Sequence, residues 1–143
     1  MLKLLLTIVL GFSLVACANQ QSVVVNPGTN MDSFKTVYVV RQPKDKEMIN
    51  TIIAENLRKR GVNATAGNGP APTNVDAVIT YIDRWMWDIT MYLLQLTVIV
   101  QDPKTERPLA TATSLHGSLT RLTPTEMVDE TLNNLYNGKV LPK

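Results

Sequence analysis

Apolar residues recur along this chain with two spacings, every second residue and every third or fourth residue. Alternation over residues 34–40 predicts a strand that places Phe34, Tyr38 and Val40 on one face. Helical spacing follows over about residues 43–60, where it involves Met48, Ile49, Ile52, Ile53 and Leu57. Pro43 fits the first position of this helix, and Gly61 fits the residue after its end.

Strand patterns return as a weak segment at 62–66, two long segments at 76–87 and 92–101, and a last segment at 109–116. In 92–101, alternation puts Leu94, Leu96, Val98 and Val100 on one face. In 76–87 neither face is purely apolar, so we expect a β-bulge near Asp83 or Arg84.

A second helix is predicted after residue 122. Thr123 and Glu126 have the spacing of a capping box, with Pro124 between them at the first helical position. An apolar stripe follows up to Tyr136, and Gly138 fits the residue after the helix. The order β-α-β-β-β-β-α predicts an α+β domain: a single antiparallel or mixed sheet of about 4–5 strands, with two helices packed on one face.

The N-terminus carries Lys3 and an apolar run of about 12 residues, Leu4 to Val15. This run is too short to cross a bilayer, which takes about 20 residues, and has the dimensions of a signal peptide over residues 1–16. An uncleaved membrane anchor is the alternative. Leu14-Val15-Ala16-Cys17 resembles the lipobox of bacterial lipoproteins. The resemblance implies that Cys17 is lipidated and becomes the first residue of the mature chain. A free thiol in an ordinary exported protein is the other interpretation.

The same resemblance implies attachment to the outer membrane, because the residue after the cysteine is Ala18 and not the aspartate that marks inner-membrane retention in Gram-negative lipoproteins. Residues 17–33 are interpreted as the lipidated cysteine and a flexible tether, in which 23–25 would form at most a short edge strand. Residues 34–143 are then the α+β domain, facing the periplasm.

Composition narrows the classes of function. The formal net charge is +2, and Lys3 is one of the 14 basic residues, so the mature chain has no electrostatic footprint for nucleic acid. His116 is the only histidine, which excludes a zinc site built on several histidines. We expect no cofactor, no metal and no catalytic residue. An exposed strand-end position is expected for His116. A hydrolase around His116, with Ser114 or Ser118 as nucleophile, is kept as a third hypothesis.

The two tryptophans give the candidate binding residues. Strand alternation puts Tyr81, Trp85 and Trp87 on one face. They would either cover the end of the core or form an aromatic platform for a protein or glycan partner. A membrane-interface role for the indoles is a further interpretation. Asp83 and Asp88 fall on opposite faces, which argues against a paired acid and base.

Residues 75–88 and 92–105 resemble the central hairpin of small Gram-negative envelope lipoproteins of unknown function. The wider pattern is similar to the periplasmic αβ modules of envelope-assembly lipoproteins and of the N-terminal domain of the translocation protein TolB. The resemblance implies a non-enzymatic role. The first hypothesis is an outer-membrane lipoprotein whose domain binds or scaffolds an envelope protein; the alternative is a ligand- or glycan-binding lipoprotein that uses Tyr81, Trp85 and Trp87.

Overall fold

The computed structural model describes residues 19–142. The predicted signal peptide and Cys17 lie outside this range. Its elements, in chain order, are β1 (Asn19–Val25), η1 (Met31–Ser33), β2 (Thr36–Val40), α2 (Ile49–Lys59), β3 (Asn63–Gly67), β4 (Ala77–Asp88), β5 (Thr90–Gln101), β6 (Pro108–His116), η2 (Ser118–Thr120) and α3 (Pro124–Asn137).

The strands form one mixed sheet in the order β1-β6-β5-β4-β2-β3. β2 runs parallel to both β3 and β4, and the other neighbours are antiparallel. The expectation of about 4–5 strands is wrong, because the sheet has six. The additional strand is β1, which pairs with β6 along its whole length, from Asn19 opposite His116 to Val25 opposite Ala110.

β1 also corrects the interpretation of residues 17–33 as a tether. Residues 19–25 are a sheet strand, and Met31 in η1 is buried. The folded domain therefore includes residues 19–33 and does not begin at Phe34. The cause is the edge of β6, with which these residues pair. Along β1 the side chains then alternate, so that Val23 and Val25 pack against the core while Gln20 and Ser22 are exposed.

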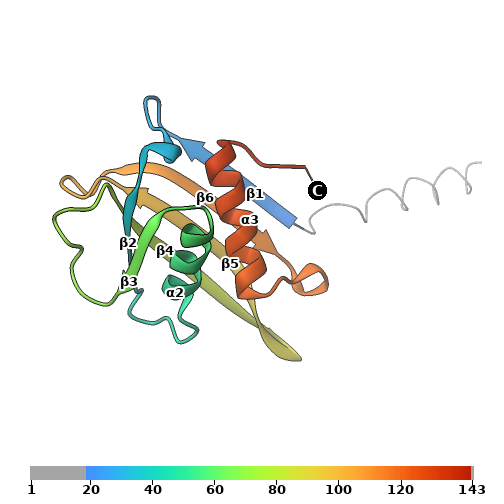
Figure 1. Ribbon diagram of the computed structural model, residues 1–143. Coiled ribbons are helices and arrows are strands. Elements are labelled where there is room, and N and C mark those ends of the chain that lie inside the picture. Colours follow the sequence, from blue (N-terminus) through green and yellow to red (C-terminus); the bar gives the residue numbers. More distant parts are fainter. Residues whose placement is uncertain (1–18, 143) are drawn as a thin grey trace, which may run out of the picture.

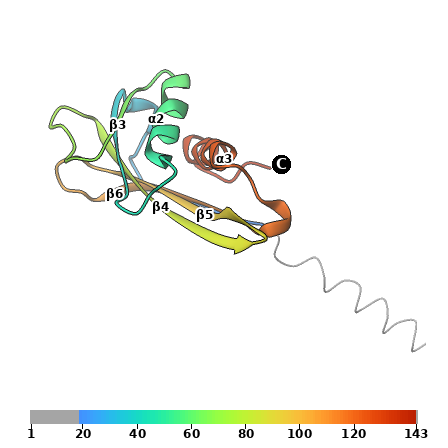
Figure 2. The ribbon, with the colours of Figure 1, turned by 90° about the horizontal axis from the view of Figure 1, so that it is seen from below.

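Both helices pack on the same face of the sheet, as predicted, which makes the domain two layers deep (Figures 1 and 2). No helix of the described residues covers the other face. The loop between β3 and β4 covers part of that face, where Tyr38, Val75 and Val78 form a small separate apolar cluster. The face over β1, β6 and β5 carries hydroxyl and amide side chains, such as Ser22, Gln95 and Thr113, together with the apolar side chains of Val24 and Leu115.

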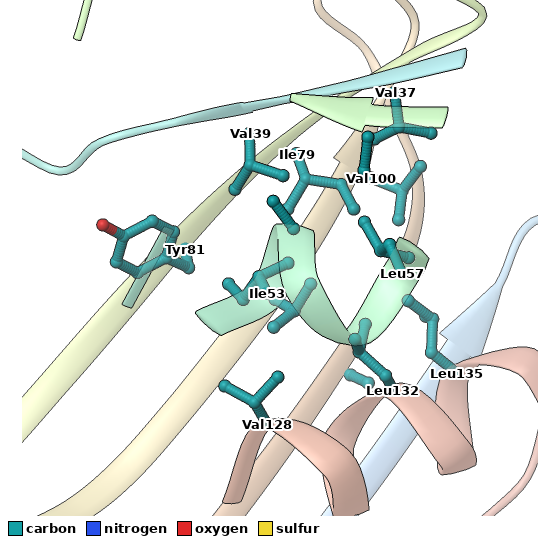
Figure 3. Close-up of a cluster of buried hydrophobic side chains, with 14 of the residues drawn as sticks. Val37, Val39, Ile53, Leu57, Ile79, Tyr81, Val100, Val128, Leu132 and Leu135 are labelled. Carbon is teal, nitrogen blue, oxygen red and sulfur yellow. The ribbon is translucent and has the colours of Figure 1, made fainter. Parts of the chain in front are cut away.

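The main core lies between the sheet and the helices (Figure 3). Ile53 and Leu57 of α2 and Leu132 of α3 are completely buried there against sheet residues such as Val39 and Ile79. The helical stripe had singled out Ile53 and Leu57. On β2, however, Val39 faces the helices, whereas Tyr38 and Val40 of the predicted face pack on the opposite side of the sheet. The capping box of α3 is present, with both Thr123–Glu126 hydrogen bonds, and Gly138 adopts the left-handed conformation expected after the helix.

Helix α2 begins at Ile49, six residues later than predicted from Pro43. The reason is Asp45, a buried residue whose carboxylate accepts hydrogen bonds from the backbone amides of Glu47 and Ile49, at 2.7 Å each. These bonds hold residues 45–48 in a turn, which ends at Met48 with φ 59°. Asp45, which precedes the helix by four residues, therefore caps the N-terminus of α2 with its side chain.

The expected β-bulge is present, as a register shift between Arg84 and Trp85 in the β4–β5 pair. Arg84 pairs with Gln95, whereas Trp85 pairs with Leu93. Simple alternation predicted that Leu94 would share the buried face of β5. The bulge instead places Leu93 there, at 1 % exposure.

Candidate functional site

The three candidate binding residues lie at three different depths. Tyr81 is buried, Trp85 is half-buried against the core, and Trp87 is 69 % exposed. They follow one another along β4 but do not form one exposed aromatic platform. Only Trp87 presents most of its ring to solvent.

Tyr81 holds the β2–α2 connection against the sheet. Its hydroxyl donates a hydrogen bond of 2.6 Å to Asp45 Oδ2 and accepts one of 3.1 Å from the amide of Gln42. Burial, followed by the hydrogen bond to Asp45, raises the pKa of the Tyr81 hydroxyl far above its ordinary value. The phenol therefore stays protonated and continues to donate. These contacts give Tyr81 a structural role at the start of α2.

We expect Tyr81→Phe to lower the free energy of unfolding by about 1.5–3 kcal/mol, because a buried hydrogen bond to a charged group is lost. Urea denaturation followed by circular dichroism measures the loss. Tyr38→Phe is the matched control, since the Tyr38 hydroxyl reaches only the Gly69 carbonyl, at 3.4 Å. Equal losses in both variants would contradict the role given to the Tyr81–Asp45 bond.

Asp83 and Asp88 are separate, as the sequence indicated. Asp83 accepts hydrogen bonds from Trp85 Nε1 at 2.8 Å and from Gln42 Nε2 at 2.9 Å. Asp88 accepts a short hydrogen bond from the Ser118 hydroxyl. Each carboxylate thus fixes a local contact, and the two do not face one another across a common site.

His116 is completely buried, so the expectation of an exposed strand-end histidine is wrong. Its Nε2 lies 2.6 Å from Glu130 Oε2, and its Nδ1 lies 3.0 Å from the carbonyl oxygen of Thr120. Ser114 is also buried and accepts a hydrogen bond from the Thr131 hydroxyl. With both ring nitrogens engaged in this way, neither is placed to activate a serine.

Glu130 was not predicted as the partner of His116. The signal was that Met127, Glu130 and Asn134 have the spacing of one helix face, which put polar groups on the buried side of α3. The network continues into β1. Gln21 Nε2 donates to Glu130 Oε1 at 2.8 Å, and Asn134 Nδ2 donates to Gln21 Oε1 at 2.7 Å. It therefore joins the edge strand to α3.

Exposed apolar side chains gather where the β4–β5 hairpin turns. We call this group the apolar end and define it as Met86, Trp87, Ile89, Met91 and Leu119. Their exposed fractions are 47 %, 69 %, 87 %, 55 % and 99 %. Figures 1 and 2 show the hairpin reaching beyond both helices on this side of the molecule.

Arg121 ties this hairpin to the segment that carries Leu119. Its guanidinium lies over the Tyr92 ring, 4.5 Å from the centroid, and donates to Thr90 Oγ1 at 2.7 Å and to the Asp88 carbonyl oxygen at 3.2 Å. A further bond of 2.9 Å runs to the carbonyl of Ser118. The residues behind the apolar end are therefore held in place by the polar contacts of Arg121. We call these residues the frame of the apolar end.

Ile89 occupies the turn between the two strands with φ 64°. This left-handed conformation costs a β-branched residue roughly 1–2 kcal/mol, and glycine or asparagine is the usual choice. The side chain is also almost fully exposed, so burial does not offset the strain. Nothing in the fold explains an isoleucine here, which makes Ile89 a candidate functional residue.

Replacing Ile89 with glycine is expected to raise the free energy of unfolding by about 1 kcal/mol, because the strain is removed. The midpoint of thermal or urea unfolding reports the gain. Ile82→Gly is the matched control, since Ile82 is exposed on β4 without a left-handed backbone, and there glycine should destabilise. A loss of stability in both variants would contradict the strain at Ile89.

A hollow of about 510 Å³ lies on the helix-free face, across β1, β6 and β5. Its lining is mainly amide and hydroxyl groups, from Asn19, Gln20, Gln21, Ser22, Gln95, Thr113 and Leu115. In the part of the chain that the structure describes, no helix combines the length and the apolar character needed to cross a membrane.

No family model matches the chain, and neither does any curated protein. Solved structures with a similar fold include a PelC dodecamer from Paraburkholderia phytofirmans, at 15 % identity and a TM-score of 0.59, covering 82 % of this chain and 98 % of that one. A variant of the PelC dodecamer from the same organism, in another crystal form, is 18 % identical with a TM-score of 0.58, covering 80 % and 94 %.

A minor lipoprotein from Acinetobacter baumannii, at 16 % identity over 76 % of this chain and 97 % of that one, reaches a TM-score of 0.35, which is too low to show a common fold. At these identities the PelC structures show a common fold and nothing more. The expectation of a small α+β domain with two helices and an open mixed sheet is confirmed by the elements and strand order of this chain.

Proposed function

We propose that the chain is a lipoprotein, anchored to the outer membrane through Cys17, whose domain faces the periplasm and acts as a binding or scaffolding module for an envelope protein. The observation that carries the proposal is the helix-free face of the sheet over β1, β6 and β5. A six-stranded sheet with helices on one side only leaves a broad surface and a free edge strand for a partner.

The chemistry of this face suits a polar protein contact. Thr97 and Thr113 bond to each other across β5 and β6, with their hydroxyl oxygens 3.0 Å apart, and Gln95 lines the hollow beside them. Amide and hydroxyl groups both donate and accept, so they match the exposed backbone and side chains of another protein. The PelC structures with a similar fold are dodecamers, which makes a further copy of this chain the first partner to test.

The anchor is tested first. In cells fed a labelled fatty acid, Cys17→Ser is expected to lose the label and to leave the membrane fraction, because the variant has no thiol to acylate. Ser118→Ala is the control, since it leaves Cys17 intact. If the Cys17→Ser chain keeps both its label and its membrane attachment, the lipoprotein assignment is wrong.

The binding face is tested by in-cell photo-crosslinking from Gln95 and Thr97, with Glu55 on the exposed side of α2 as the matched control. An adduct with one defined envelope protein, or with a second copy, from Gln95 and Thr97 but not from Glu55 supports the proposal. No protein adduct from either position, or equal adducts from Glu55, would count against it.

A further inference from the structure

The apolar end lies at the same end of the sheet as the start of β1. Asn19 pairs with His116, the last residue of β6. Asn19 Oδ1 also accepts a hydrogen bond of 2.5 Å from the hydroxyl of Thr120, which follows Leu119 directly. Figures 1 and 2 both place the start of β1 beside η2, on the side toward which the β4–β5 hairpin projects.

The position of Asn19 fixes how far an anchor at Cys17 could lie from this end. Cys17 precedes Asn19 by two residues, and two residues of chain span at most about 7 Å. A bilayer that held acyl chains on Cys17 would thus come within one or two side-chain lengths of the residues around Leu119. The domain could not stand away from the membrane on a long tether, because residues 19–25 belong to the sheet.

We propose that the apolar end lies in the head-group region of the bilayer. The acyl chains on Cys17 and the inserted side chains of the apolar end then jointly fix the orientation of the domain relative to the membrane. This inference rests on the proposed function, because it requires the lipid on Cys17. Tryptophan is the side chain that favours the membrane–water interface most clearly, and Trp87 is exposed here among Ile89, Met91 and Leu119.

The geometry favours a lipid contact made by apolar side chains over one made by charges. Arg121 is engaged with Tyr92, Thr90 and the backbone, and Asp88 is engaged with Ser118. The contact therefore does not depend on anionic lipid. The frame behind the apolar end is already ordered, so little conformational entropy is lost on contact.

The inserted position also accounts for Ile89. A left-handed isoleucine at a fully exposed turn is unfavourable for the folded domain in water, on both backbone and solvation grounds. In the head-group region, next to the acyl chains, the Ile89 side chain is removed from water. Its contact with lipid then offsets the free-energy cost of its left-handed backbone.

The test uses the full lipidated chain with Trp85→Phe, which leaves Trp87 as its one tryptophan. The protein is reconstituted in phosphatidylcholine vesicles with and without brominated acyl chains. We expect the Trp87 emission to shift to shorter wavelength, to be quenched by the brominated lipid, and to be shielded from acrylamide. The matched control carries Trp85→Phe, Trp87→Phe and Lys104→Trp, because Lys104 is exposed in the loop at the opposite end of β5. Its emission should be quenched by acrylamide only.

Flotation of the vesicles separates the two proposals. If the chain does not float with the vesicles, it has no anchor, and both proposals are overturned. If it floats while acrylamide but not bromolipid quenches Trp87, the lipoprotein assignment stands and the membrane contact of the apolar end is overturned. If Trp87 is shielded from both quenchers, a second copy or another protein covers the apolar end, which also overturns the lipid contact.

A pair of turn variants in the Trp85→Phe chain gives an independent measurement. Ile89→Asn suits the left-handed backbone and keeps the fold, so we expect flotation unchanged and bromolipid quenching of Trp87 reduced. Glu106→Asn is the control, because Glu106 is also left-handed, with φ 57°, but lies in the loop at the other end of the sheet. Equal quenching in the two variants would overturn the proposal.

Discussion

Replacing Ile53 with alanine is expected to lower the free energy of unfolding by about 2–5 kcal/mol. Ile53 is completely buried and lies in the core between the sheet and α3, where Figure 3 shows it among side chains of both layers. The removed methylene and methyl groups lose their contacts, and the rigid sheet limits how far the site can collapse. A domain of this size has a total stability of roughly 5–15 kcal/mol, so one such substitution removes a large part of it.

Chemical denaturation of the Ile53→Ala variant measures the loss. Ile82→Ala is the matched control, because it removes the same atoms from a half-exposed position on β4, and it should cost less than about 1 kcal/mol. Similar losses in the two variants would show that α2 does not pack into the core as described.

His116→Ala is expected to cost about 2–4 kcal/mol, because it removes the 2.6 Å contact between His116 Nε2 and the Glu130 carboxylate in a largely buried position. The side chain of His116 is 1 % exposed and that of Glu130 is 14 % exposed. Gln21 still donates to the other Glu130 oxygen, which keeps the loss below that of a fully orphaned charge. The measurement is the urea midpoint at neutral pH.

A double variant distinguishes this cause from the loss of volume alone. His116→Leu with Glu130→Met replaces both members of the pair by apolar side chains, and we expect it to recover most of the stability that His116→Ala loses. If the double variant is as unstable as His116→Ala, the cost comes from packing around β6 and not from the lost contact between His116 and Glu130.

Local patterns predicted most of the layered fold. The capping box and apolar stripe of α3, the two long central strands and the bulge near Arg84 all follow from residues that are close in sequence. The start of α2 was placed too early because Asp45 acts through buried hydrogen bonds, which no propensity reports. Local order was predictable because its causes are local.

The missed features depend on distant partners. β1 begins with Asn19-Gln20-Gln21-Ser22, which lacks an apolar alternation, and becomes a strand because β6 offers it an edge. His116 is buried because Glu130 reaches it from α3. For Tyr81, Trp85 and Trp87, strand alternation predicted a common face of β4, but it did not predict how deeply each side chain is buried. Tyr81 is buried and its hydroxyl binds Asp45, whereas Trp87, next to the end of β4, is exposed.

The pairing of β1 with β6 also determines the order in which the domain can be completed. Among the described residues, the one strand that pairs with β1 is β6, which lies far along the chain and ends at His116. During synthesis β1 is made before β6 and stays unpaired until β6 (Pro108–His116) has been made. Until then β6 is not available to β1, so closure of the sheet at this edge is a late step in the folding of the domain.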